Sequence, residues 1–249
     1  MLDIQIEACV DSVESATQAQ AGGARRVELC AALSEGGTTP SLGTIALARE
    51  RLRIDLFVLI RPRGGDFRYS SVEYETMARD VTAAKAAGAD GLVLGALTER
   101  GEVDRDGVRR LLDAARPLPV TFHRAFDASR DLDEALDVLL GLGVHRVLTS
   151  GGEATALAGV PRLSGLVRLA GDRLTVMAGG GIDESNAVRI ARETGVKEIH
   201  LRGTVPRPSG VTFRNPRLVL GKPVVSADDT RLVTDAARVR AVVNLLAEA

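Results

Sequence analysis

Residues 83–94 read AAKAAGADGLVL and join the end of a helix to the start of a strand. An amphipathic Ala-rich pattern runs up to Ala87, Gly88 ends it, and Gly91–Leu94 is a short apolar run. Glycine readily takes the left-handed conformation at a helix C-terminus, which turns the chain back toward the next strand. The same Gly-Ala or Gly-Val step recurs before other apolar runs, at Gly23-Ala24, Gly143-Val144 and Gly195-Val196. This repeat predicts helices that each return the chain to a strand.

Short apolar or β-branched runs recur along the whole chain, with amphipathic stretches rich in Ala and Arg between them. Eight strand–helix units in about 230 residues favour a (β/α)8 barrel over an open doubly wound sheet. We expect one TIM-barrel domain over residues 1–249, with the barrel at about 1–225 and a C-terminal tail helix at about 228–249. The expected strands are Asp3–Ala8, Arg26–Cys30, Asp55–Ile60, Gly91–Leu94, Val120–Phe122, Arg146–Leu148, Leu174–Met177 and Lys197–Leu201. The expected helices include Ser12–Ala21, Val72–Ala87, Val103–Ala115, Leu132–Leu140 and Glu184–Glu193.

The composition excludes several classes of partner. The chain has 249 residues, with 32 Lys+Arg against 33 Asp+Glu and a formal net charge of −1. This balance argues against nucleic acid, because displacing phosphate counterions needs a basic face. No stretch approaches the ~20 apolar residues of a membrane span, and the first residues lack the pattern of a secretory signal. Two cysteines are too few for a disulfide scaffold, so we expect a cytoplasmic protein with no membrane partner.

The first two expected strands each end in Glu-x-Cys. In such barrels the chemistry lies at the C-terminal ends of the strands. Side chains alternate along a strand, so Glu7 and Cys9 share one face, as do Glu28 and Cys30. The apolar residues between them should meet the helices, which turns both pairs toward the barrel mouth. Two nearby thiolates form a soft site suited to Cu(I); the alternative is two buried cysteines that act as small apolar residues.

An arginine-rich hook follows the third expected strand. Arg61 and Arg63 flank a proline, and two glycines and Asp66 come next. Guanidinium groups bind carboxylate or phosphate through two parallel hydrogen bonds. Their position at a strand end predicts an anion-binding site, although surface arginines are common in a chain this rich in Arg.

Histidine ends the fifth strand and lies on the eighth. Alternation points His123 into the barrel, and its ordinary pKa near neutrality suits a general acid or base. Arg124 and Asp127 follow it, the first as an anion ligand and the second as a further candidate catalytic carboxylate. His200 is a second candidate ligand, on the face that also carries Glu198 and Arg202.

Glycine-rich segments follow the sixth and seventh strands. Ser150 precedes two glycines, and Gly179, Gly180 and Gly181 form a triple glycine before the next helix. Many barrels bind phosphate with the loops that follow strands seven and eight. We therefore expect these residues to bind phosphate or a similar anion.

At these residues the chain resembles the CutC family, whose members are named for copper homeostasis. The resemblance implies a (β/α)8 barrel, a cytoplasmic location, a homo-oligomer (dimer or tetramer) and a role in copper binding or tolerance. Cys9 and Cys30 match the two cysteines proposed as Cu(I) ligands in animal members. After His200, where many bacterial relatives carry small Ser or Ala residues, Leu201-Arg202-Gly203 stands here. The matching stretches are Glu7–Ser15, Val27–Thr44, Ile60–Ser70, Thr121–Asp127, Leu148–Gly152, Met177–Ile182 and Glu198–His200.

Two hypotheses about function remain open. In the first, the chain is a copper homeostasis protein that binds copper as Cu(I) through Cys9 and Cys30. In the second, it is an enzyme acting on a small anionic metabolite, with no direct role in copper homeostasis. The arginines and glycine-rich loops would then bind the anion, while Glu7, Glu28 and His123 move protons.

Overall fold

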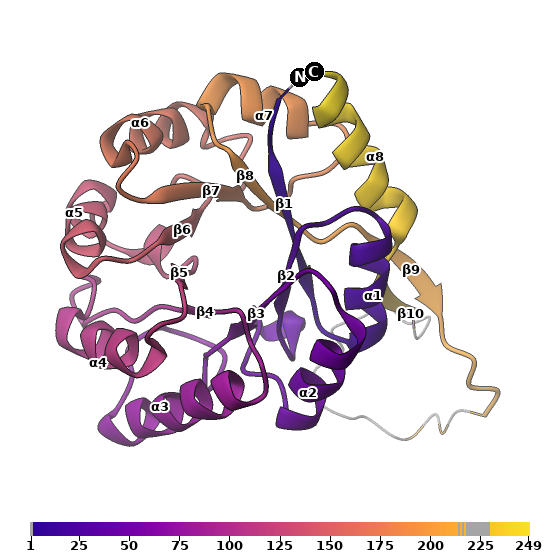
Figure 1. Cartoon of the computed structure of the whole chain (residues 1–249), viewed down its shortest axis with the longest axis horizontal. Coiled ribbons are helices and arrows are strands. Elements are labelled where there is room, and N and C mark those ends of the chain that lie inside the picture. Colours follow the sequence, from indigo (N-terminus) through magenta and orange to yellow (C-terminus); the bar gives the residue numbers. More distant parts are fainter. Residues whose placement is uncertain (1, 214, 216, 218–229) are drawn as a thin grey trace.

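A computed structural model describes residues 2–213, 215, 217 and 230–249. Eight parallel strands form a closed barrel in sequence order, and helices surround it (Figure 1). The barrel strands are β1 (Gln5–Val10), β2 (Arg26–Leu29), β3 (Asp55–Leu59), β4 (Gly91–Leu94), β5 (Val120–Phe122), β6 (Arg146–Thr149), β7 (Thr175–Gly179) and β8 (Glu198–Leu201). The helices are α1 (Val13–Ala21), α2 (Leu42–Arg51), α3 (Ser71–Ala86), α4 (Arg105–Ala115), α5 (Leu132–Leu142), α6 (Val160–Ala170), α7 (Ala187–Thr194) and α8 (Ala236–Glu248).

The predicted (β/α)8 barrel is confirmed, and so is the role of its glycines. Gly88 has φ +87° and Gly143 has φ +73°, the left-handed conformation that lets each helix end and the chain turn back. The barrel closes because β1 pairs with both β2 and β8. Closure leaves none of these eight strands at a free edge.

Capping side chains set the starts of α1 to α5 and of α8. At α3, the Ser70 side chain accepts from the N–H of Glu73, and the Glu73 carboxylate accepts from the N–H of Ser70. Two predicted starts are wrong. Helix α4 begins at Arg105 rather than Val103, because Val103 forms a β-bridge with Leu97. Helix α7 begins at Ala187 rather than Glu184, because a turn over residues 183–186 precedes it.

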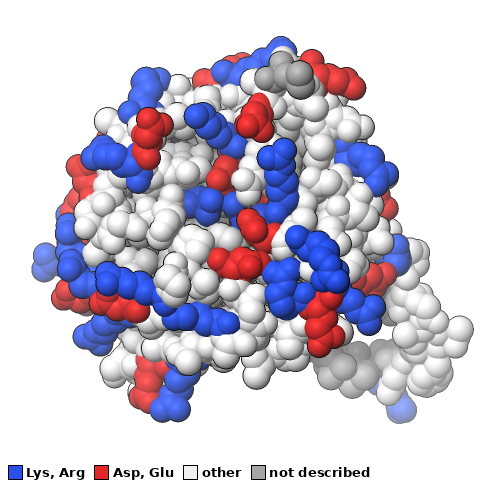
Figure 2. Space-filling model, in the orientation of Figure 1, with Lys and Arg blue, Asp and Glu red and all other residues white. Residues whose placement is uncertain are grey.

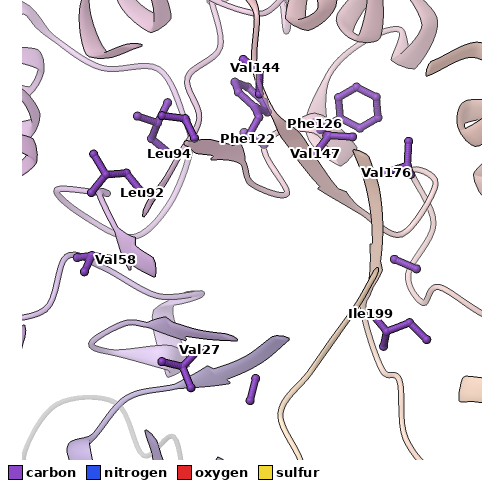
Figure 3. Close-up of a cluster of buried hydrophobic side chains, with 14 of the residues drawn as sticks. Val27, Val58, Leu92, Leu94, Phe122, Phe126, Val144, Val147, Val176 and Ile199 are labelled. Atoms are coloured by element: carbon purple, nitrogen blue, oxygen red, sulfur yellow. The ribbon is translucent and has the colours of Figure 1, made fainter. Parts of the chain in front are cut away.

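Apolar side chains fill the space between the barrel and the helices. Outward-facing strand residues pack there against the helices, and Figure 3 labels several of them around the ring of strands. The barrel interior is different, because it holds buried charged groups such as Arg26 and Glu7. The pleat therefore separates an apolar outer core from a polar inner one.

The chain after β8 adds two features. Strands β9 (Thr204–Pro208) and β10 (Thr230–Thr234) form an antiparallel pair beside the barrel. Helix α8 then packs between α1 and α7, which confirms a C-terminal helix (Figure 1). The predicted boundary between barrel and tail, at residues 225–228, lies outside the described residues. Within the described part of the chain, no helix is both long and apolar enough to span a membrane.

Candidate functional site at the barrel mouth

The two cysteines lie side by side at the ends of β1 and β2. Cys9 lies on β1, and Cys30 follows β2 directly, where its N–H donates to the carbonyl of Val10 (2.8 Å). Their sulfurs are 3.9 Å apart, and both side chains are buried, free thiols. The closeness that neighbouring strands predict is therefore confirmed. The pair packs against Phe57, Leu59 and Val93 of β3 and β4.

A histidine connects the thiols to the two buried glutamates. Nδ1 of His200 is 2.7 Å from Oε1 of Glu7, and Nε2 is 3.5 Å from Oε2 of Glu28. His200 also interacts electrostatically with Cys9. Cys9, Glu28 and Cys30 form one group whose potential ligand atoms lie within 4.8 Å of one another, and Glu7, Glu28 and His200 form another. Glu28 belongs to both groups.

Burial and mutual contacts set the charges of this cluster. Burial favours the neutral form of Glu7, but Arg26 and His200 outweigh it and lower the pKa to about 2. The hydrogen bond with Cys30, aided by His200, lowers the pKa of Cys9 well below its ordinary value. Burial opposes protonation of His200, but its hydrogen bonds with Cys9 and Glu7 hold its pKa well above the ordinary value. The two opposite shifts favour a thiolate at Cys9 beside an imidazolium at His200.

The pKa values of the other two members of the cluster, Glu28 and Cys30, are raised. Burial, followed by the charge on Cys9, raises the pKa of Glu28 well above its ordinary value. The contact with Cys9, followed by burial, does the same to Cys30. Either sulfur can donate in the 3.9 Å contact between the two thiols, and Sγ of Cys30 also donates to the carbonyl of Glu28 (3.8 Å).

An ion-pair network closes the barrel interior beneath the cluster. Arg26 pairs with both Glu7 and Glu198, and Arg146 binds Glu198 through two hydrogen bonds of 2.5 and 3.0 Å. Both guanidinium groups lie over the ring of Phe57, 4.9 and 5.5 Å from its centroid. The network holds Glu7 in place from below while His200 contacts it from above.

His123 lies at the end of β5 as predicted, but outside the thiol cluster. Its ring lies over Gly95, where any side chain would clash with it. Nδ1 accepts from the N–H of Ala125 (3.1 Å). Burial, helped by the positive charge of Arg61, lowers the pKa of His123 to about 3. Within the described residues, no hydrogen bond joins it to Glu7 or Glu28.

Asp127 binds the ends of β5 and β6 together. Its carboxylate accepts from Nε of Arg124 (2.7 Å) and from the N–H groups of Ser150 (3.0 Å) and Gly152 (3.0 Å). The Ser150 hydroxyl accepts in turn from Nη2 of Arg124 (2.7 Å). Asp127 and Ser150 thus position the Arg124 guanidinium.

The arginine hook bonds to its own loop and to the loop after β2. Arg61 donates to the carbonyls of Glu35 (2.8 Å), Gly37 (2.6 Å) and Gly65 (2.8 Å). Arg63 pairs with Asp66 (3.0 Å) and with Glu73 (2.6 Å), the first-turn carboxylate of α3. Arg63 and Asp66 therefore partner each other at the rim.

A pocket of about 400 Å³ opens beside the thiol cluster, after β7 and β8. The positive φ values of Gly180 (+113°) and Gly181 (+70°) shape its floor. Nη1 of Arg124 approaches to 3.4 Å from where a Cβ of Gly180 would stand. Gly179 lies deeper and makes room for the ring and Cβ of His200. The lining includes Cys9, Arg124, Gly180, Gly181, His200 and Arg202.

Sequence reasoning missed Arg26 and Arg146 as site residues, whereas it placed Arg202 on the same face as His200. Arg26 is two positions before Glu28, so the alternation that turns Glu28 inward also turns Arg26 inward. Strand alternation alone could therefore have indicated Arg26 as an inward-facing residue. Arg202 lines the pocket together with His200.

Comparison with known proteins gives consistent matches. A model of the CutC family matches residues 4–205. The human "Copper homeostasis protein cutC homolog" is 49% identical over 94% of this chain and 86% of its own length. A "family protein CutC" from Bacteroides fragilis is 48% identical over 96% of each chain. The crystal structure of the putative copper homeostasis protein CutC from Streptococcus agalactiae aligns with a TM-score of 0.77 and 37% identity, over 80% of this chain and 98% of that one.

Proposed function

This chain belongs to the CutC family, and from that membership and its paired thiols we propose that it binds Cu(I) as a copper homeostasis protein. The observation that carries the proposal is the 3.9 Å separation of the Cys9 and Cys30 sulfurs. With metal–thiolate bonds of about 2.3 Å, two sulfurs can share one ion only when they lie within about 4.6 Å. The pair meets this condition.

The chemistry of the pair suits a soft cation. Thiolates favour Cu(I) over harder ions, and the surrounding apolar side chains exclude water from the sulfurs. The lowered pKa of Cys9 supplies one thiolate, while Cys30 must release its proton on binding. Glu28 and His200 lie close enough to accompany the two sulfurs.

An anaerobic Cu(I) titration against a chromophoric chelator tests this proposal. We expect one Cu(I) per wild-type chain, and at least a 100-fold weaker affinity in the Cys9→Ser/Cys30→Ser variant. Arg63→Gln is the control, because Arg63 bonds only within its own loop and to Glu73. Equal Cu(I) affinity in wild type and the double variant would contradict the proposal.

A second candidate function rests on the 400 Å³ pocket. We infer an enzyme that binds a small anionic metabolite, such as a phosphorylated one, through Arg124, Arg202 and the backbone at Gly180 and Gly181. The lowered pKa of the adjacent Cys9 supports reactivity at this place. Glu7, Glu28, His123 and Asp127 remain the candidate catalytic residues.

Inorganic phosphate and pyrophosphate are the probes for this second function. We expect either anion to raise the Tm of the metal-free wild type, and Arg124→Gln to abolish the rise. Arg168→Gln, on the exposed side of α6, is the control. No anion-dependent shift in the wild type would exclude this site.

We also propose a cytoplasmic homo-oligomer, a dimer or tetramer. Exposed apolar side chains on adjacent helices support an interface: Leu42 (57% exposed) and Leu47 (43%) on α2, and Val72 (70%) on α3. On the face seen in Figure 2, basic and acidic side chains are interspersed. That face offers no broad basic surface to nucleic acid.

A further inference from the structure

Three buried polar atoms have no hydrogen-bond partner in the described part of the chain: Nε of Arg61, the hydroxyl of Tyr69 and Nε2 of His123. All three side chains are more than nine-tenths buried, with exposures of 4%, 8% and 6%. Buried polar groups are almost always hydrogen-bonded, so each exception calls for an explanation. These three also lie in one region, at the ends of β3 and β5.

Phe67 contacts two of the three groups. The Arg61 guanidinium lies 5.0 Å from the centroid of the Phe67 ring, and the His123 ring lies 5.1 Å from the same centroid. Arg61 also lies beside the Tyr69 hydroxyl, whose pKa it lowers against the larger effect of burial. Arg61 therefore shares the Phe67 ring with His123 and influences the Tyr69 hydroxyl directly. Phe67 itself is only half-buried.

The hydrogen bonding of His123 makes its free nitrogen a donor. Nδ1 accepts the N–H of Ala125, so this nitrogen carries a lone pair. A neutral imidazole then holds its proton on Nε2. Arg61 Nε and the Tyr69 hydroxyl are donors as well. The region thus presents three N–H or O–H groups and needs an acceptor.

The charge of Arg61 indicates which kind of acceptor is needed. Its terminal nitrogens donate to three neutral backbone carbonyls. No carboxylate of the described residues forms an ion pair with it, although other buried arginines such as Arg26 have one. A buried charge without a counter-ion is costly. Water would satisfy the donors but would leave this charge uncompensated.

We propose that Arg61, Tyr69 and His123 form a binding site for the carboxylate of a small organic acid. A carboxylate accepts at about four lone-pair positions, enough for the three donors. Its single negative charge balances the single guanidinium, whereas a phosphate dianion would leave an excess charge. The site is separate from the thiol pair and from the glycine-lined pocket, and it does not depend on copper binding.

Formate tests the site in the metal-free, full-length protein. We expect saturable binding, measured by the movement of the His123 ¹⁵N resonances at constant ionic strength, with chloride as the reference anion. Tyr69→Phe removes one donor and keeps the ring, so the dissociation constant should rise about tenfold. Tyr74→Phe is the matched control, because the Tyr74 hydroxyl donates to Asp104 (2.6 Å) and its ring lies 6.0 Å from that of Tyr69.

The outcomes separate this site from the two functions proposed above. The proposed carboxylate site is supported if Cys9→Ser/Cys30→Ser and Arg124→Gln both bind formate as the wild type does. It also requires that Tyr69→Phe binds formate more weakly, whereas Tyr74→Phe does not. The proposal is overturned if formate leaves the His123 resonances unmoved. It is equally overturned if folded Tyr69→Phe and Tyr74→Phe bind formate as the wild type does.

Discussion

His123 is held in an environment that excludes its charged form. Its ring lies between Gly95, Phe67 and Phe122, and the nearby charge is the positive one of Arg61. Glu7 is in the opposite situation, since Arg26 and His200 stabilise its charge. Two inward-facing groups of one barrel are therefore driven to opposite protonation behaviour by their immediate neighbours.

The lowered pKa of His123 predicts a pH dependence of stability. The unfolded chain binds a proton at this histidine below about pH 6.5, whereas the folded chain does so only near 3. The unfolded state binds more protons in this window, so stability falls as the pH falls. From pH 7.5 to 5 the loss from this group is about 2 kcal/mol. Urea unfolding at both pH values should show a smaller loss in His123→Gln than in wild type.

His145 provides the control for this measurement. It is exposed just before β6, so His145→Gln should retain the full wild-type difference between pH 7.5 and 5. A His123→Gln variant with the same pH dependence as wild type would show that the imidazole is not held neutral.

Alternation along a strand predicts which residues face the barrel mouth, and it worked for Glu7, Cys9, Glu28 and Cys30. It does not predict what a long side chain binds. Arg61 stands at a strand end as expected, but its terminal nitrogens turn to carbonyls of the loop after β2, which lies far away in sequence. Such contacts depend on tertiary packing, so no local pattern reveals them.

Strand β4 and the residue after it fit the barrel because two positions there, Gly91 and Gly95, carry no side chain. At Gly91 a Cβ would stand 2.3 Å from the Phe57 ring, and at Gly95 it would stand 2.6 Å from the His123 ring. The strand thereby makes room for the aromatic group beneath the arginines and for the histidine above it. These glycines serve packing and not a turn.

The same substitution should have opposite effects at two glycines. Gly91→Ala forces Phe57 and the arginines over it to move, and we expect a loss of about 1–3 kcal/mol in the free energy of unfolding. Gly43→Ala, on exposed α2 with nothing within 4 Å, should stabilise by about 0.5–1 kcal/mol through helix propensity. Chemical denaturation of both variants checks the pair. Equal effects would mean that β4 tolerates a side chain.

Element types were predictable from periodicity, but some boundaries and one pairing were not. Val103 fits a helical pattern, yet its bridge to Leu97 takes it out of α4. The β9–β10 pair joins Thr204–Pro208 to Thr230–Thr234, and no local sequence pattern in either strand predicts its partner. Long-range strand pairing depends on the tertiary fold, whereas the ends of the glycine-terminated helices depend on the local sequence.

At the scale of the whole molecule, α8 completes the ring of helices. It contacts α1 and α7 and buries Val239, Val242 and Leu246. An ion pair between Arg238 and Glu184 joins it to the segment before α7. The last helix of the chain thus covers the first strands of the barrel.

Deleting residues 236–249 should therefore unfold the barrel. Each of the three buried side chains contributes about 1.5–3 kcal/mol, which together approaches the whole stability of a typical domain. We expect the truncated chain to lack a cooperative thermal transition by circular dichroism. Leu245→Ser, at a position 38% exposed, should keep that transition within a few degrees of the wild type. A truncated chain that melts cooperatively would show that the barrel does not need α8.

The closed ring also brings the two ends of the chain together. The N–H of Leu2 donates to the carbonyl of Leu246 (3.4 Å), and both ends lie where the strands begin, away from the mouth (Figure 1). A short linker can therefore join them, and the chain can be reopened at an exposed loop to give a circular permutant. A reporter fused at either native end would leave the thiols and both anion sites unobstructed, so ligand binding can be followed on an immobilised protein.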